Sequence, residues 1–173
     1  PSRTAGMLPT MLLSLRVKNF AIVETLEVDF APGLNVITGE TGAGKSIVIG
    51  ALSLLLGARA DRNQIRSGTE QCAVEAIFEL RDPGLVAGVL DDLGIAPCED
   101  GRLIIRRLVT ATGAGRQLIN DTPTTLQGLK RVGDVLVDLH GPHDHQSLLN
   151  PDFQLDLLDG FGHLEDVRTA YSR

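Results

Sequence analysis

Hydrophobic and polar residues alternate along several short segments of this chain, and this alternation predicts half-buried β-strands. The segments are residues 12–17, 25–30, 73–80, 102–110 and 116–119. A turn is expected at Lys18–Phe20, and another at Ala31–Gly33, where proline and glycine punctuate the pattern. The second turn would join the strand 25–30 as a hairpin to the apolar run 34–38, for which the pattern predicts a buried strand.

Longer apolar segments predict helices. Residues 47–56 are apolar on nearly every helical face, which is typical of a fully buried helix, and Gly57 is a suitable stop. Further helices are expected after Asp82-Pro83 and over 124–132, 151–158 and 163–173, with a short strand over 135–139. Antiparallel hairpins followed by a strand–helix arrangement predict an α/β fold, in which an antiparallel β flank adjoins a mixed or parallel core sheet.

One motif carries the clearest chemistry. The run Gly39-Glu40-Thr41-Gly42-Ala43-Gly44-Lys45-Ser46 matches G-x-x-x-x-G-K-[ST], and it lies between the predicted strand 34–38 and the predicted helix 47–56. In that setting the backbone N–H groups of the loop and the helix N-terminus surround phosphate groups. Lys45 would reach the β- and γ-phosphates, and the Ser46 hydroxyl would bind Mg²⁺. The motif therefore predicts a P-loop NTPase that binds ATP with Mg²⁺.

Composition narrows the setting. The formal charge is −6, which argues against a basic surface over the whole chain, although a local patch for nucleic acid stays open. The two cysteines are far apart in sequence, so a disulfide framework is not expected and a reducing cytoplasm fits. No stretch approaches the ~20 apolar residues that span a bilayer, so no membrane partner is expected. Residues 1–10 are interpreted as an extension or tag remnant.

The hydrolytic machinery is incomplete in this sequence. No apolar strand ends in Asp-Glu, no Leu-Ser-Gly-Gly segment occurs, and the guanine-reading Asn-Lys-x-Asp is absent. The last predicted helix also has no stop. These observations indicate a fragment that binds ATP without efficient turnover.

Four segments resemble the N-terminal half of an SMC-like ABC ATPase head: residues 13–23, 35–46, 115–120 and the histidine-rich 138–149. The resemblance implies an N-terminal lobe over 11–161 and the start of a coiled-coil arm over 162–173. It implies that the C-terminal half of the same head supplies the signature motif and the Walker B acids. It further implies ATP-dependent dimerisation with a second head, and action on double-stranded DNA at breaks in the bacterial nucleoid.

The same resemblance implies roles for individual residues. Lys45 and Gln146 would be the catalytic pair, with Gln146 joining Ser46 around Mg²⁺, unless the sensor position is the one that Pro142 occupies. Arg66 would approach the nucleotide, or it is an ordinary surface arginine. Lys18 and Asn19 would line the base or phosphate side of the nucleotide, or they belong to a plain turn.

Two other functions stay open. His140, His143 and His145, with Asp138 and Asp144 nearby, offer ligands that suit zinc or manganese, as in a metal-dependent hydrolase. Alternatively the chain is a non-catalytic module for DNA binding or dimerisation. In that case three arginines of the predicted strand 102–110 would contact the phosphate backbone, or they would form a solvated strand face: Arg102, Arg106 and Arg107.

Overall fold

Six β-strands form one sheet in the computed structural model, which describes residues 10–38, 44–98, 100–137 and 139. The strand order is β2-β1-β3-β4-β5-β6, and every neighbouring pair in it is antiparallel. The chain divides into two units, Pro1–Val137 and Asp138–Arg173, and every element described here belongs to the first. The strands are β1 (Thr10–Phe20), β2 (Val23–Asp29), β3 (Gln71–Leu80), β4 (Arg102–Thr110), β5 (Gly115–Ile119) and β6 (Thr122–Thr124).

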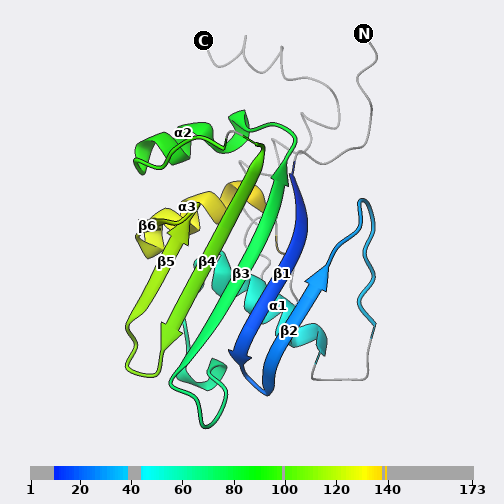
Figure 1. Cartoon of the computed structure of the whole chain (residues 1–173), viewed down its shortest axis with the longest axis vertical. Coiled ribbons are helices and arrows are strands. Elements are labelled where there is room, and N and C mark those ends of the chain that lie inside the picture. The colour runs from blue at the N-terminus through cyan, green and yellow to red at the C-terminus, as the bar shows by residue number, and fades with distance from the viewer. Residues whose placement is uncertain (1–9, 39–43, 99, 138, 140–173) are drawn as a thin grey trace, which may run out of the picture. The chain divides into compact units, whose positions relative to one another are not determined.

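Helices cover one face of the sheet. The helix α1 (Gly44–Leu55) lies behind the strands in the view of Figure 1, while α2 (Gly84–Asp92) and α3 (Leu126–Leu136) pack against each other near one end of the sheet. The short 3₁₀ helix η1 (Arg62–Gln64) lies in the connection from α1 to β3. No helix in the described part of the chain is long and apolar enough to cross a bilayer.

The core lies between the sheet and α1. Alternate residues of the three central strands point to the helices and are almost completely buried, among them Leu15, Phe78 and Ile105. From α1 the buried residues are Ile47, Val48, Ala51, Leu54 and Leu55. Aliphatic residues fill most of this space, since the whole chain has five phenylalanines, one tyrosine and no tryptophan.

The end of α1 meets α3 at two glycines. A Cβ at Gly57 would lie 2.9 Å from the backbone Cα of Lys130, and a Cβ at Gly133 would lie 2.9 Å from the carbonyl oxygen of Leu56. Both distances are shorter than real Cβ contacts, so side chains larger than hydrogen would force the two backbones apart. Gly57 also has a φ of +99°, which L-residues rarely adopt.

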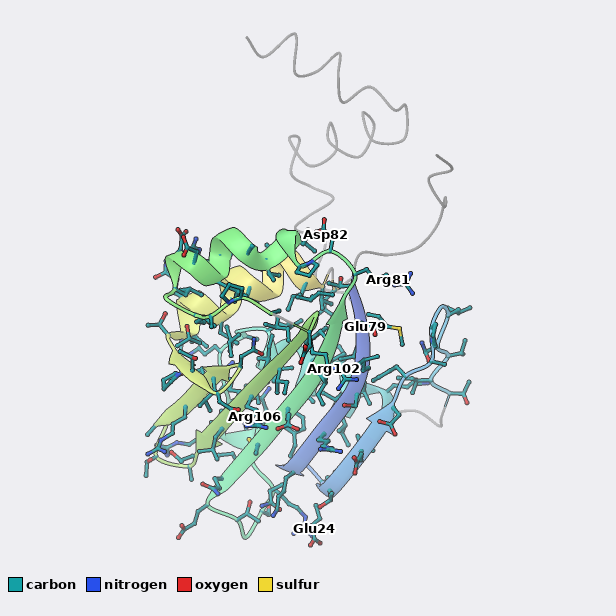
Figure 2. All side chains as sticks on the ribbon, turned by 45° about the horizontal axis from the view of Figure 1, so that its top comes forward. Glu24, Glu79, Arg81, Asp82, Arg102 and Arg106 are labelled. Atoms are coloured by element: carbon teal, nitrogen blue, oxygen red, sulfur yellow. The ribbon has the colours of Figure 1, made fainter. Side chains whose placement is uncertain are left out.

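The other face of the sheet carries a row of charges that crosses four strands and ends in the turn between β5 and β6, and we call it the charge ladder: Glu27, Arg16, Glu75, Arg106 and Asp121. Arg16 lies 2.7 Å from Glu27 and 3.6 Å from Glu75, and Arg106 pairs with both Glu75 and Asp121. These pairs raise the pKa values of both arginines, with the hydrogen bonds to Glu27 and to Glu75 as the largest causes. In Figure 2, Arg106 is labelled together with Glu79 and Arg102, which lie opposite each other in the strand register of β3 and β4.

Several predicted elements are confirmed and one turn is wrong. The strands β3, β4 and β5 match the predicted segments within two residues. The predicted turn at Lys18–Phe20 is instead the end of β1, because Phe20 pairs with Val23 and the chain reverses at Ala21-Ile22. Ala21 has a φ of +51° in this tight reversal, an unusual conformation that no glycine marks in the sequence.

The predicted buried strand 34–38 is wrong. These residues belong to no strand, and Leu34 and Val36 are 90% and 72% exposed. The Asn35 side chain instead makes local hydrogen bonds, accepting from the Ala31 N–H at 3.0 Å and donating to the Ala31 carbonyl at 2.7 Å. The predicted hairpin around Ala31–Gly33 therefore does not form. The α/β fold and the antiparallel flank are confirmed, while the described strands include no parallel pair of the predicted mixed or parallel core.

Two further expectations are corrected. The helix α1 is not buried on every face, because Ile49 is 55% exposed. The strand predicted for 135–139 is wrong, since Val135 and Leu136 belong to the last turn of α3. In α3 the buried residues recur at helical spacing, as Leu129, Val132 and Leu136, so its apolar side continues through this segment.

Candidate nucleotide-binding site

The first turn of α1 is exposed and carries the last three residues of the phosphate-loop motif, Gly44, Lys45 and Ser46. A helix leaves its first N–H groups without partners inside the helix, and the aligned peptide dipoles add partial positive charge there. This turn contains no acidic residue that would compete with an anionic ligand. The predicted loop residues Gly39–Ala43 lie outside the described residues, so their roles toward phosphate stay predictions.

Packing fixes where this turn lies. The buried side of α1 rests on β1, β3 and β4, and Gly50 faces the ring of Phe20, whose Cζ would lie 3.4 Å from an added Cβ. An added Cβ would make ordinary van der Waals contact with the ring, so the helix lies close to the end of β1 at this point. The exposed N-terminal turn is therefore carried by an element anchored in the core.

Asn19 and Arg66, both predicted to bind nucleotide, are brought together although 47 positions separate them. The Arg66 N–H donates to the Asn19 carbonyl at 3.0 Å, and the Ala21 N–H donates to the Gln64 carbonyl at 2.7 Å. Asn19 has a φ of +54°, a conformation that asparagine tolerates better than most residues. Since Phe20 follows Asn19 and packs on α1, this pair belongs to the same part of the fold as the helix. Their contact with nucleotide stays a prediction.

Arg66 has an acidic neighbour that sequence reasoning missed. Its Nη2 lies 4.0 Å from the Glu24 carboxylate of β2, and both side chains are open to solvent. The pair is therefore weak, worth at most about 1 kcal/mol. Arg66 is only loosely held and remains accessible to a ligand.

The three arginines of β4 differ in surroundings. Arg102 is exposed, and Arg106 forms ion pairs with Glu75 and Asp121 in the charge ladder. Arg107 is only 4% exposed, so the suggestion that it contacts a DNA backbone is wrong. It points to the helical face, where its Nη1 donates to the carbonyl oxygens of Leu54 and Ala58, the latter at 2.6 Å.

Burial lowers the pKa of the Arg107 guanidinium from its ordinary value, and it raises the pKa of the neighbouring Cys72 thiol. The sequence did contain a signal for the inward position of Arg107. In β4 the residues Leu103, Ile105, Arg107 and Val109 share one alternation, and all of them are buried. A charged residue in the apolar phase of a strand is expected to have a specific partner.

Other predicted residues lie outside the description. Gln146, Pro142 and the histidines of the predicted metal cluster, His140, His143 and His145, are not among the described residues. Their roles stay predictions. Within the described ranges, no group of three or more His, Cys, Asp or Glu residues is placed to hold a metal ion.

Comparison with known proteins agrees with this fold. The sequence profile of the AAA domain family matches residues 14–122. The DNA repair protein RecN of Vibrio cholerae is 42% identical over 165 residues, which is 93% of this chain and 29% of that protein. RecN of Bacillus subtilis is 41% identical over 155 residues, which is 90% of this chain and 27% of that protein.

Solved structures show the same fold at low sequence identity. An SMC ATPase, from a study of its ATP-driven dimerisation and DNA-stimulated activation, has a TM-score of 0.60 at 21% identity and covers 86% of this chain and 97% of its own. The recombination mediator RecF with ATP has a TM-score of 0.59 at 16% identity, and the match covers 91% of this chain and 39% of the RecF chain. The chain spans less than a third of the length of the two RecN relatives described above, and it is similar to them over nearly its own whole length. It belongs to the AAA domain family.

Proposed function

We propose that this chain is the ATP-binding N-terminal part of an SMC-like ATPase head that acts in the repair of DNA double-strand breaks. The observation that carries the proposal is the exposed first turn of α1, on which Lys45 and Ser46 complete the phosphate-loop motif. The similarity to proteins named for DNA repair supports the biological role.

In this proposal the triphosphate lies against the backbone N–H groups of Gly39–Ser46. Lys45 neutralises the β- and γ-phosphates, and the Ser46 hydroxyl, with Gln146, holds the accompanying Mg²⁺. Asn19 and Arg66 face the rest of the nucleotide. A helix N-terminus favours this ligand because fixed peptide dipoles replace the water that solvated its charge.

We propose that the C-terminal half of the same head is the first partner. Leu34, Val36 and Ile37 are large apolar residues that are exposed in this chain, directly before the phosphate loop. Adjacent exposed apolar residues of this kind commonly mark an interaction surface. The chain spans 29% of the length of the Vibrio cholerae relative, and we propose that a segment from the remainder of a longer protein covers these apolar residues.

Hydrolysis, dimerisation of two heads around ATP, and double-stranded DNA as the other partner follow as parts of the same proposal. The chain alone would bind ATP without efficient turnover, because the signature motif and the Walker B acids are not in its sequence. The whole protein would act at the nucleoid in the bacterial cytoplasm, with residues 162–173 beginning a coiled-coil arm.

Isothermal titration calorimetry with a non-hydrolysable ATP analogue and Mg²⁺ tests the binding step. We expect the chain to bind and Lys45→Ala to lose most of the affinity without unfolding. Lys130→Ala, which removes an exposed lysine of α3, is the matched control and should bind like the parent. Equal affinity of the parent and Lys45→Ala would contradict the proposal. ATPase activity should appear only when the C-terminal half is added.

A further inference from the structure

Arg107 is a buried cation that faces the C-terminal end of α1. Its Nη1 donates to the Leu54 carbonyl in the last turn and to the Ala58 carbonyl just beyond the helix. Within the described residues it forms no ion pair with a carboxylate, and its Nε has no hydrogen-bond partner. Among the described residues, the acceptors of this guanidinium are therefore the carbonyl groups at the end of α1.

These carbonyls are suitable acceptors for a cation. The Leu54 carbonyl also accepts from the Gly57 N–H at 3.2 Å, so the guanidinium uses its second lone pair, and the helix dipole places partial negative charge at this end of α1. Hydrogen bonds from an ionised donor are shorter and stronger than those between neutral groups. Burying a cation without a carboxylate nevertheless costs free energy, so an apolar side chain at this position would stabilise the core more if packing were its only role.

What the guanidinium adds is direction. The apolar contacts between α1 and the sheet are non-directional, and they resist sliding of the helix along its axis only weakly. Hydrogen bonds lose strength quickly when distance or angle changes, so the two bonds from Arg107 fix the axial position of α1 on β4. The Gly57–Gly133 contact limits how closely α1 and α3 approach, but it supplies repulsion rather than a directed attraction.

The other end of the same helix carries the candidate nucleotide site. With 12 residues, α1 is about 18 Å long at the ordinary helical rise, and a helix of this length moves as a nearly rigid rod. An axial shift at Leu54 would therefore displace Lys45 and Ser46 by a similar amount.

We propose that Arg107 is a positioning residue of the nucleotide site: by holding the C-terminal end of α1, it sets where the N-terminal turn presents Lys45 and Ser46 to the triphosphate. This inference rests on the proposed function of the site. It gives Arg107 a role in nucleotide affinity beyond its contribution to stability.

Arg107→Met and Arg107→Lys test the inference in the 173-residue chain, with Arg106→Met as the matched control. Methionine keeps an unbranched side chain and removes the donors, while lysine keeps the charge without the fork of the guanidinium. Arg106 is the residue before Arg107 on β4, but it points to the opposite face of the sheet and pairs with Glu75 and Asp121 instead of contacting α1. For each variant we would measure the affinity for a non-hydrolysable ATP analogue with Mg²⁺, the urea unfolding curve, and the backbone amide NMR signals of Lys45 and Ser46 without nucleotide.

We expect Arg107→Met to lose about tenfold or more in affinity while folded, with Arg107→Lys intermediate. The Lys45 and Ser46 amide signals should shift in Arg107→Met and stay unchanged in Arg106→Met, whatever each variant does to stability. A folded Arg107→Met with parental affinity and unshifted signals would overturn the inference.

Two further outcomes are also decisive. If Arg107→Met does not fold, Arg107→Lys carries the test, and parental affinity in that variant would overturn the inference. If the parent chain does not bind the analogue, the proposed function fails. The amide signals of Lys45 and Ser46 then still decide whether Arg107 controls the position of α1.

Discussion

Replacing Gly57 by alanine should destabilise the fold strongly, because two separate costs meet at this residue. Its φ of +99° is a conformation that an alanine adopts only under strain, which costs about 1–3 kcal/mol. The new Cβ would also lie 2.9 Å from the Cα of Lys130, and a backbone atom cannot move aside as the end of a side chain can. Forcing extra volume into a packed site costs about 1–3 kcal/mol.

The sum predicts that Gly57→Ala lowers the free energy of unfolding by about 2–6 kcal/mol, a large share of the stability of an ordinary domain. Urea unfolding followed by far-UV circular dichroism measures it. Fluorescence is unsuitable because the chain has no tryptophan and only one tyrosine.

Two other glycines separate the costs. Gly68 has a φ of +83° with nothing within 4 Å of an added Cβ, so Gly68→Ala should show the conformational cost alone. Gly133 lies inside α3, where alanine gains about 1 kcal/mol of helix propensity, so Gly133→Ala should show the contact cost less this gain. If Gly57→Ala costs no more than Gly68→Ala, then α1 and α3 do not approach as closely as described, and the reasoning is refuted.

Two further predictions concern charge. Glu75→Gln leaves Arg16 and Arg106 without their shared carboxylate and should lower the free energy of unfolding by about 1 kcal/mol, and 1 M NaCl should reduce this loss. Glu79→Gln on the same strand is the control. Equal losses of stability in both variants would contradict the ion pairs that we assign to Glu75. Burial raises the pKa of the Cys72 thiol above its ordinary 9.0 against the opposing charge of Arg107, so the folded chain holds this proton more tightly than the unfolded chain does. The resulting stabilisation is complete below pH 9 and is lost as the pH rises through the folded pKa. Cys72→Ala should therefore weaken the loss of stability above pH 9, and a pH dependence identical to that of the parent would refute this.

The alternation of residue types predicted the central strands well because those strands have one buried face. In β3 and β4 every second residue is buried in the core, so apolar residues recur at every second position of the sequence. The segment 34–38 has the same apolar character but no neighbouring strand among the described residues. Its composition gave no indication of whether a partner strand lies within this chain.

For the site, the motif alone located the exposed turn of α1, because glycine, lysine and serine at that spacing have a direct chemical reason. The proximity of Asn19 and Arg66 required the fold, since backbone hydrogen bonds between segments far apart in the sequence leave no pattern in side-chain type. Arg107 was visible as a charge in an apolar phase, but its acceptors are backbone carbonyls, which every residue has. Sequence reasoning therefore assigned it to the wrong face.

The central claim is that the N-terminal turn of α1 binds the phosphates of a nucleotide. A crystal structure of this chain soaked with a non-hydrolysable ATP analogue and Mg²⁺ tests it most directly. We predict phosphate oxygens within hydrogen-bond distance of the Gly44, Lys45 and Ser46 backbone N–H groups, with Mg²⁺ on the Ser46 hydroxyl. An analogue bound elsewhere, with this turn empty at saturating concentration, would contradict the account.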